Sequence, residues 1–249
     1  MLRTAAAVTL VALLALAVPA VLAETSGKDD LGPIDYLRIP HGEAGLTAEQ
    51  ALAREGWQPL PGQTPNFGYD EDVFWYHLPV PAGDSPLILS IHYAHLDNIR
   101  FWPLTNGKPG TMVQTGDQYP FAQRPMRHPS FLFPMERTAG ADHGALLRVQ
   151  TQGAHHIPMK LSEPRSLFLQ LSREDQLNAL YYGILITITL FSLMVFAGLQ
   201  EKIYLYYTAT TASFLLLLMS LRGTTYPLLW PESPVLQNHS ILVTVPLTA

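Results

Sequence analysis

The chain has 249 residues, a formal net charge of −5 at pH 7 and 14% charged residues, and this mild acidity without a basic run excludes a nucleic-acid partner. It contains no cysteine, which excludes disulfides, thiolate metal sites and a cysteine nucleophile. Only four Asp, Glu, Lys or Arg residues follow Gln176, namely Glu201, Lys202, Arg222 and Glu232. This segregation of charge predicts that one part of the chain lies in water and the other in lipid.

Residues 1–23 have the three parts of a secretory signal peptide. Arg3 is the charged residue at the start, residues 5–18 form the apolar core, and a small-residue cleavage site ends at Ala23. The mature chain is therefore expected to start near Glu24. An uncleaved N-terminal anchor is the less favoured alternative, because the apolar run is short for a hydrocarbon core roughly 30 Å thick. Either outcome places the following domain outside the cytoplasm.

Residues 24–172 are expected to form an exported all-β domain, because short apolar runs alternate with proline and glycine. Residues 87–93 alternate in the manner of a strand with one face on a core. A short helix at residues 46–52 has a capping box from Thr47 to Gln50. Six or more short strands predict a two-sheet sandwich of jelly-roll type. The other predicted strands are residues 73–78, 99–102, 112–114, 131–135, 146–151 and 157–161, with turns at 81–84, 106–107 and 109–110.

Residues 173–249 are expected to lie in the membrane. Residues 177–199 and 203–221 are apolar and long enough to span it, and only a short turn separates them, so they predict an antiparallel hairpin. Residues 223–234 are expected to form an exported loop. Residues 236–249 predict part of a third helix, so the chain is expected to be cut off within a larger bundle.

No spacing typical of a catalytic or phosphate-binding motif is present, so neither an enzyme nor a cofactor is expected. A metal site is not expected either. His92 and His95 would point to opposite faces of a strand, and the adjacent His155 and His156 would diverge in the same way. Structural or surface roles are favoured for all four.

Residues 115–129 combine charged side chains with aromatic and proline residues. A polar cluster on a stiff loop suits the recognition of a small polar or anionic ligand, with arginine as a bidentate donor. An equally favoured alternative is that Asp117 and Arg124 pair only to hold a long connection in place. An aromatic platform for a sugar ring could be formed by Trp102, Trp75, Trp57 and Tyr119, although core packing is the commoner role of a strand tryptophan such as Trp75.

The sequence resembles the bacterial seven-transmembrane receptors with diverse intracellular signalling modules, in the version with the second type of extracellular domain. The resemblance covers most of the chain after Ala23. One departure is His77, which stands where the family usually has arginine. The stretches that carry the resemblance are residues 66–69 (NFGY), 75–78 (WYHL), 97–102 (DNIRFW), 115–117 (TGD), 120–121, 124–125, 147–153 (LRVQTQG), 181–183 (YYG), 202–207 (KIYLYY) and 230–231 (WP).

The resemblance implies a sensor domain similar to carbohydrate-binding modules, on the periplasmic side of a bacterial inner membrane, above a seven-helix bundle. Relatives would add a cytoplasmic histidine kinase or diguanylate cyclase, and such an output module is expected to be absent from this chain. The favoured function is a ligand-sensing receptor truncated before its output module, with a small molecule or carbohydrate as ligand and a homodimer or another receptor as a possible assembly. A module that binds a periplasmic protein is the alternative, and a membrane-tethered hydrolase is a distant third. The candidate ligand-binding residues are Asp97, Arg100, Trp102, Asp117, Tyr119, Arg124, Arg127 and His128.

Overall fold

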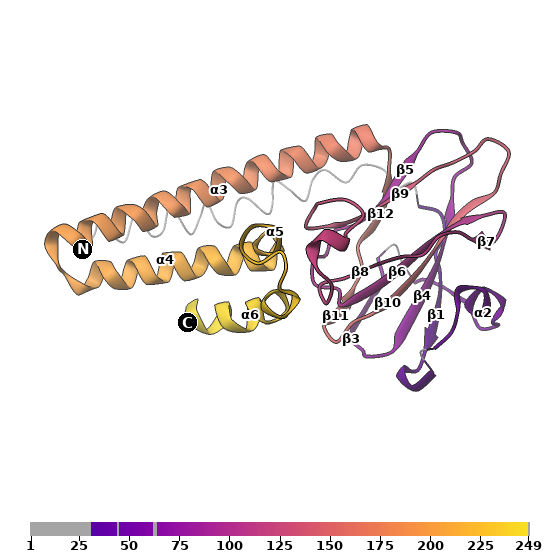
Figure 1. Ribbon diagram of the computed structural model, residues 1–249, viewed down its shortest axis with the longest axis horizontal. Helices are drawn as coiled ribbons and strands as arrows, with labels where there is room; N and C mark the ends of the chain where they lie inside the picture. Colours follow the sequence, from indigo (N-terminus) through magenta and orange to yellow (C-terminus); the bar gives the residue numbers. More distant parts are fainter. Residues whose placement is uncertain (1–30, 44, 62–63, 249) are drawn as a thin grey trace.

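A computed structural model describes residues 31–43, 45–61 and 64–248 of the chain. The predicted signal peptide lies outside these residues. A strand-rich domain is followed by helices, and the helical hairpin extends away from the strands in one direction (Figure 1).

The strand-rich domain contains two antiparallel sheets, which we call the large sheet and the small sheet, and one two-stranded ribbon. The large sheet has the order β2-β1-β4-β10-β6-β7, with β8 also paired to β6, and the small sheet has the order β12-β5-β9. The ribbon pairs β11 with β3. The strands are β1 (Asp35–Ile39), β2 (Gln58–Pro59), β3 (Asn66–Tyr69), β4 (Val73–Val80), β5 (Leu87–Ile91), β6 (Asn98–Thr105), β7 (Lys108–Pro109), β8 (Val113–Thr115), β9 (Phe131–Met135), β10 (His143–Gln150), β11 (Ala154–His156) and β12 (Met159–Ser162).

Most predicted strands are confirmed, and the differences lie at their ends. Residues 157–161 are not one strand, because β11 ends at His156 and β12 starts at Met159. The predicted turn at Asn106 and Gly107 joins β6 to β7, and both residues have positive φ, at 50° and 72°. Two consecutive positive φ values are what a tight two-residue hairpin needs.

The main core lies between the two sheets. The large sheet contributes Phe74, Phe101 and Leu147, and the small sheet contributes Leu89 and Phe133, all essentially inaccessible to water. The rings of Phe101 and Phe133 stack with their centroids 4.6 Å apart. This burial of apolar surface between two sheets stabilises the domain without disulfides.

A second, smaller core lies on the outer face of the large sheet. Helix α2 (Ala48–Ala53) covers it there and packs Ala48 and Ala51 near Trp75. The predicted capping box is confirmed: the Thr47 N–H donates to Gln50 Oε1 at 2.9 Å, and the Gln50 N–H donates to Thr47 Oγ1 at 3.3 Å. Two one-turn 3-10 helices, η1 (His41–Glu43) and η2 (Phe121–Gln123), lie in the connections.

Among the residues that the structure describes, two helices are long and apolar enough to cross a membrane, α3 (Pro164–Leu199) and α4 (Lys202–Leu221). They pack side by side as the predicted hairpin (Figure 1). The short helix α5 (Thr225–Leu229) lies in the segment expected to be a loop, and α6 (Pro234–Thr248) packs against α4.

The helix that contains the expected span 177–199 is longer than the span itself, because α3 begins at Pro164. The drop in charge near Gln176 therefore does not coincide with the start of the helix. At 1.5 Å per residue, 36 residues extend about 54 Å, well beyond a hydrocarbon core roughly 30 Å thick. The first turns of α3 therefore stand outside the lipid, and Arg173, Glu174 and Asp175 lie within a continuous helix.

Candidate functional site

A polar surface occupies the outer face of the large sheet, beside the region that α2 covers. Along β6 and β10, Ile99, Phe101 and Leu147 point into the main core, so their neighbours Arg100 and Arg148 point outward. The two arginines are directly opposite each other in the register of these strands. Together with the polar side chains around them they form what we call the outer-face site, which comprises Asn98, Arg100, Gln114, Tyr119, Arg148 and Gln150.

The Arg148 side chain is buried, with 3% of its surface exposed, and Arg100 is half-buried. Arg148 Nη2 donates to Gln150 Oε1 at 3.0 Å. Burial lowers the pKa of Arg148 to about 10, and the neighbouring Arg100 adds to this effect. The Arg148 guanidinium therefore remains charged at neutral pH, and it lies beside Arg100 on one sheet surface.

Tyr119 connects the sheet to the following loop. Its phenolic oxygen accepts hydrogen bonds from Asn98 Nδ2 on β6, at 3.0 Å, and from Gln114 Nε2 on β8. Because both bonds are accepted, the phenolic proton is available to a third partner. The sequence assigned this residue to a sugar platform, and the structure places it at the wall of the outer-face site.

A cavity of about 240 Å³ opens at one end of the outer-face site, where β6 and β10 meet the adjoining loops. This volume is below the usual range of drug-binding pockets, roughly 300–1,000 Å³, and suits one sugar ring or a short carboxylate. The lining is mostly polar: His41, Glu71, Asp97, Asn98, Gln118, Gln150, Thr151 and Gln152.

Asp97 and Asp117 form a buried carboxyl pair at this end of the sheet. Asp97 Oδ2 accepts hydrogen bonds from Thr151 Oγ1 at 3.0 Å and from the Gln152 N–H at 2.5 Å. Burial raises the pKa of the Asp117 carboxyl to about 7, and the charge of Asp97 raises it further in the same direction. Asp97 therefore lines the cavity. Asp117 is 2% exposed and lies in the interior of the domain.

Gly116 allows the close approach that forms this pair. Its φ is +153°, and a Cβ atom at this position would lie 1.9 Å from the carbonyl oxygen of Asp97. Only glycine avoids such an overlap with the backbone.

Arg124 was expected to donate hydrogen bonds to a ligand, and in the structure its guanidinium contacts other groups of the domain. Its Nη1 donates to the carbonyl oxygens of His128, at 2.9 Å, and of Pro129, and its Cζ lies 4.2 Å above the ring centre of Phe131. Burial lowers the pKa of this guanidinium to about 10. Asp117 favours the charged arginine electrostatically, but no hydrogen bond or salt bridge joins these two described side chains. Arg124 thus holds the loop through backbone carbonyls and aromatic rings.

Trp102 stacks on Trp75, with ring centroids 5.4 Å apart and an interplanar angle of 21°. Both rings belong to the smaller core, and Trp102 is 9% exposed. Trp102 is therefore a packed neighbour of the outer-face site and not an open platform for a sugar. His77, on the same face of β4, contacts Trp57 edge to face.

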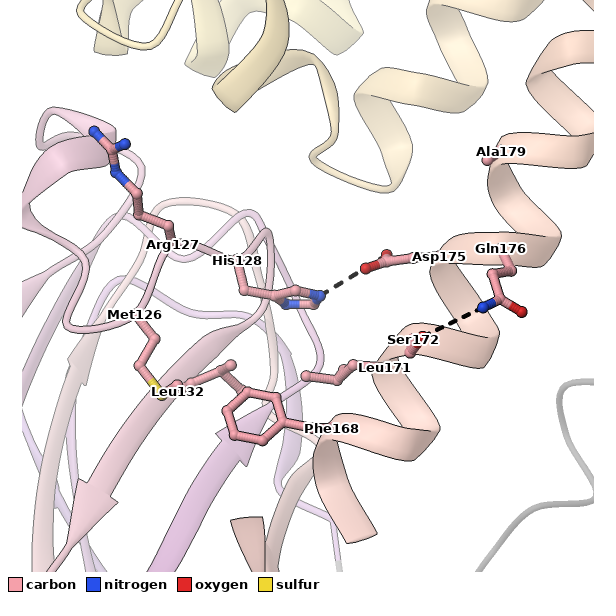
Figure 2. Close-up of a pocket in the computed structure, with 10 residues that line it drawn as sticks. All are labelled: Met126, Arg127, His128, Leu132, Phe168, Leu171, Ser172, Asp175, Gln176 and Ala179. Atoms are coloured by element: carbon pink, nitrogen blue, oxygen red, sulfur yellow. Dashed lines mark hydrogen bonds and ion pairs between the residues drawn. The ribbon is translucent and has the colours of Figure 1, made fainter. Parts of the chain in front are cut away.

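A second pocket, of about 500 Å³, lies between the strand-rich domain and the exposed turns of α3 (Figure 2). Its lining is largely apolar, with Leu132 and Phe168 facing the same space. Figure 2 shows His128 directed at Asp175, 4.0 Å away, and Arg127 pointing away from α3. Of the two predicted residues, only His128 faces the helix.

The domain and the helices also touch outside this pocket. Ile88 and Leu132 of the small sheet pack on Leu167 and Leu171 of α3. The opposite contact involves α5: the Tyr226 hydroxyl donates to the Tyr119 carbonyl oxygen at 2.5 Å.

The end of α4 also approaches the domain closely. His95 Nε2 lies 3.3 Å from the Leu221 carbonyl oxygen. Gly223 has φ +69°, and a Cβ atom there would lie 2.4 Å from Ala94 Cβ. Glycine at this helix end therefore permits the contact, and His95 has a structural partner in the membrane-facing part of the chain.

Sequence reasoning missed Arg148, Gln150, Asn98 and Gln114. One signal was available, since Arg148 is a charged residue in the otherwise apolar predicted strand 146–151. Its partner Arg100 was predicted, but their pairing depends on the register of two strands far apart in sequence. No sequence pattern indicated a role for Tyr226, because this residue acts through a contact with Tyr119, which is distant in sequence.

Two family models match the chain. One, described as 7TMR-DISM extracellular 2, matches residues 34–163, and the other, 7TM diverse intracellular signalling, matches residues 174–249. The chain belongs to the 7TMR-DISM family. The first model corresponds to the strand-rich domain and the second to the helices, so this 7TMR-DISM chain carries the extracellular and transmembrane parts of a signalling receptor in a membrane. Neither matched domain is of a catalytic type. A comparison with curated proteins found no match.

Proposed function

We propose that the strand-rich domain senses a small ligand at the outer-face site and transmits its occupancy to the membrane helices. The observation that carries this proposal is the position of Tyr119. Its hydroxyl is bonded to Asn98 and Gln114 in the outer-face site, and its backbone carbonyl is bonded to Tyr226 on α5. A ligand that displaces this phenol or orders it acts directly on a residue that holds the helical region.

Transmission requires two arrangements of the domain and helices with different affinities for the ligand, because equal affinity would shift no population. The contact of the small sheet with Leu167 and Leu171 fixes α3, whereas α5 contacts the loop next to the site. A change at Tyr119 would therefore move α5 relative to α3.

We also propose that the domain is a jelly-roll similar to carbohydrate-binding modules and lies in the periplasm, above a bacterial inner membrane. The strand order supports this fold, since consecutive strands β4, β5 and β6 alternate between the large and small sheets, as do β8, β9 and β10. The predicted signal peptide supports the orientation.

The test is a thermal-shift screen of the full chain in lipid nanodiscs against neutral sugars, acidic sugars and short carboxylates. A ligand present at 100 times its Kd adds about 2.7 kcal/mol of stability, which raises Tm by several degrees. Tyr119→Phe should reduce the shift, whereas Tyr69→Phe, on an 86% exposed residue of β3, should leave it unchanged. A folded protein that no compound stabilises would contradict direct sensing.

The alternative, a module that binds a partner receptor or a second copy of the chain, is less supported. It predicts a contiguous apolar patch on the domain. On the described part of this domain, the large apolar side chains that are exposed are Tyr69 on β3 and Met112 beside β8, which belong to different sheets.

A further inference from the structure

A cavity of about 210 Å³ lies where the strand-rich domain meets α3 and the end of α4. Two histidines of the domain line it, His92 directly after β5 and His128 shortly before β9. Two carboxylates of α3, Glu174 and Asp175, line it as well. The junction between the domain and the helices therefore brings two titratable imidazoles close to two negative charges.

The position of the proton on His128 is fixed by the loop that carries this residue. The Ser130 N–H donates to His128 Nδ1 at 3.0 Å, so Nδ1 is the acceptor and the proton of the neutral ring lies on Nε2. Nε2 is inaccessible to water and has no hydrogen-bond partner among the described residues. It is directed at Asp175 Oδ1, which lies 4.0 Å away and thus beyond hydrogen-bond distance (Figure 2).

A second proton on the His128 ring is incompatible with this arrangement. Both nitrogens of an imidazolium are donors, so Nδ1 would no longer accept the bond from the Ser130 N–H. Burial lowers the pKa of His128 below its ordinary value of 6.5, the charge of Asp175 opposes this shift, and the neighbouring His92 adds to it. The neutral ring with its bond from Ser130 is therefore complete above pH 6.5 and is lost as pH falls through the lowered pKa.

The protonated ring has a partner within reach on α3. The side chain of Asp175 is 60% exposed and has room to change its rotamer. Closing the present gap by about 1 Å would form a charge-assisted hydrogen bond between this carboxylate and Nε2. Arg124 holds the carbonyl oxygens of His128 and Pro129, so the backbone of the loop stays in place while the ring exchanges partners.

The other charged groups around the cavity set the balance between the neutral and charged rings. Glu174 favours a charge on both imidazoles, whereas Lys160 on β12 and Arg124 in the loop disfavour it, each at one ring. Arg222 lines the cavity from the end of α4 and competes for the carboxylates. Tyr93 also lines it and adds no charge, because burial raises the pKa of its phenol. The carboxylates of α3 are therefore the groups that favour protonation of the imidazoles.

We propose that this junction is a proton-responsive contact, in which protonation of His128 replaces its hydrogen bond from the Ser130 N–H by an ion pair with Asp175 on α3. The two arrangements bind the proton with different affinity, so acidification shifts the population between them. Acid would thus tie the loop of residues 115–129, which also carries Tyr119, directly to a membrane helix. The proton is the effector here, so the inference does not depend on a ligand at the outer-face site.

The titration of His128 tests the proposal in the full chain, in nanodiscs of zwitterionic lipid with EDTA present to exclude metal ions. Nitrogen NMR of protein labelled with 15N in its histidine rings distinguishes protonated from unprotonated ring nitrogens. The signals of His128 are identified by their loss in His128→Asn. At pH 8 we expect Nδ1 to be unprotonated and Nε2 protonated, and at pH 5 we expect both to be protonated. Asp175→Asn should lower the midpoint of this titration by about half a pH unit or more, because it removes a favourable charge.

A double-mutant cycle separates the ion pair from a merely structural role of His128. His128→Asn keeps an acceptor for the Ser130 N–H but cannot ionise, and Asp175→Asn removes the charge on α3. The changes in Tm of these two variants should add at pH 8 and depart from additivity by about 2 °C or more at pH 5. His77→Asn is the matched control, because this histidine contacts Trp57 on the outer face of the large sheet. Its effect should add to that of Asp175→Asn at both pH values.

Three results would overturn the inference: a His128 ring that keeps one unprotonated nitrogen at pH 5, a titration midpoint that Asp175→Asn leaves unchanged, or additivity of the two variants at both pH values. A thermal-shift screen in which no compound binds would reject ligand sensing at the outer-face site and leave these expectations unaltered.

Discussion

Tyr226 donates a hydrogen bond from its hydroxyl to the backbone carbonyl of Tyr119 at 2.5 Å, across 107 positions of sequence. The ring of Tyr226 also packs edge to face on Phe121, with centroids 5.5 Å apart. A second bond, from the Phe121 N–H to the Pro231 carbonyl oxygen at 3.1 Å, runs alongside it. The segment that follows α4 is therefore fastened to the loop that borders the outer-face site.

Tyr226→Phe should destabilise this contact without disturbing the packing of the ring. The Tyr119 carbonyl would lose a donor in a partly buried position, at a cost of about 1 kcal/mol. Thermal unfolding of the full chain in nanodiscs, followed by tryptophan fluorescence, measures the loss. Tyr69→Phe, on a largely exposed residue, is the control. Equal Tm values for wild type and Tyr226→Phe would show that the bond contributes nothing.

Leu167→Ala should loosen α3 from the small sheet. The Leu167 side chain is inaccessible to water and packs on Ile88 and Leu132, so truncation should cost about 2–5 kcal/mol. Leu169→Ala on the same helix is the matched control, because that side chain is 67% exposed and its loss should change stability by less than about 0.5 kcal/mol. Hydrogen exchange in β5 and β9 should accelerate only in the first variant. Similar exchange in both variants would refute the docking of α3 on this sheet.

Gly116→Ala should be severely destabilising because its Cβ would overlap the Asp97 carbonyl oxygen. A loss of roughly 3 kcal/mol or more is expected from the overlap and the forced backbone shift. Gly140→Ala isolates the overlap: its φ is also positive, at +84°, but nothing lies within 4 Å of the added atom. That control should cost about 1 kcal/mol. Comparable losses in the two variants would indicate that Asp97 moves aside easily.

The buried carboxyl of Asp117 should make stability fall as pH rises. Burial raises its pKa in the folded protein to about 7, against an ordinary value of 3.8, so the folded state holds the proton more tightly. This contribution is complete below about pH 4 and is lost as pH rises through about 7. The contribution of Asp117 alone is the difference in stability between wild type and Asp117→Asn at each pH, because the asparagine cannot ionise.

The Tm advantage of Asp117→Asn over wild type should accordingly be larger at pH 8 than at pH 5. Asp142→Asn, on an exposed loop residue, should show no such trend. A difference between wild type and Asp117→Asn that does not vary with pH would mean that Asp117 is ionised with an ordinary affinity for its proton.

The strands were predictable because alternation of apolar residues directly reflects which side chains face a core, as in residues 87–93. The start of α3 was not predictable from the drop in charge, because the helix begins at Pro164, before that drop. The sequence did not indicate that Phe131 lies beneath the guanidinium of Arg124 or that two backbone carbonyls accept its hydrogen bonds. The residue type shows what an arginine can bind, but the partners that it contacts depend on the tertiary fold.

The pairing of Arg100 with Arg148 and the bond from Tyr226 to Tyr119 depend on strand register and on the docking of helices. No local pattern encodes either. The candidate site therefore emerges only when the sheet is assembled.

Hydrogen exchange of the full chain in nanodiscs, with and without the ligand selected by the thermal-shift screen, tests the central claim most directly. Binding at the outer-face site should change exchange both in residues 115–129 and in α5. In Tyr226→Phe the change in residues 115–129 should persist while the change in α5 is lost. Unaltered exchange in α5 of the wild-type protein, with the ligand demonstrably bound, would contradict transmission from the site to the membrane helices.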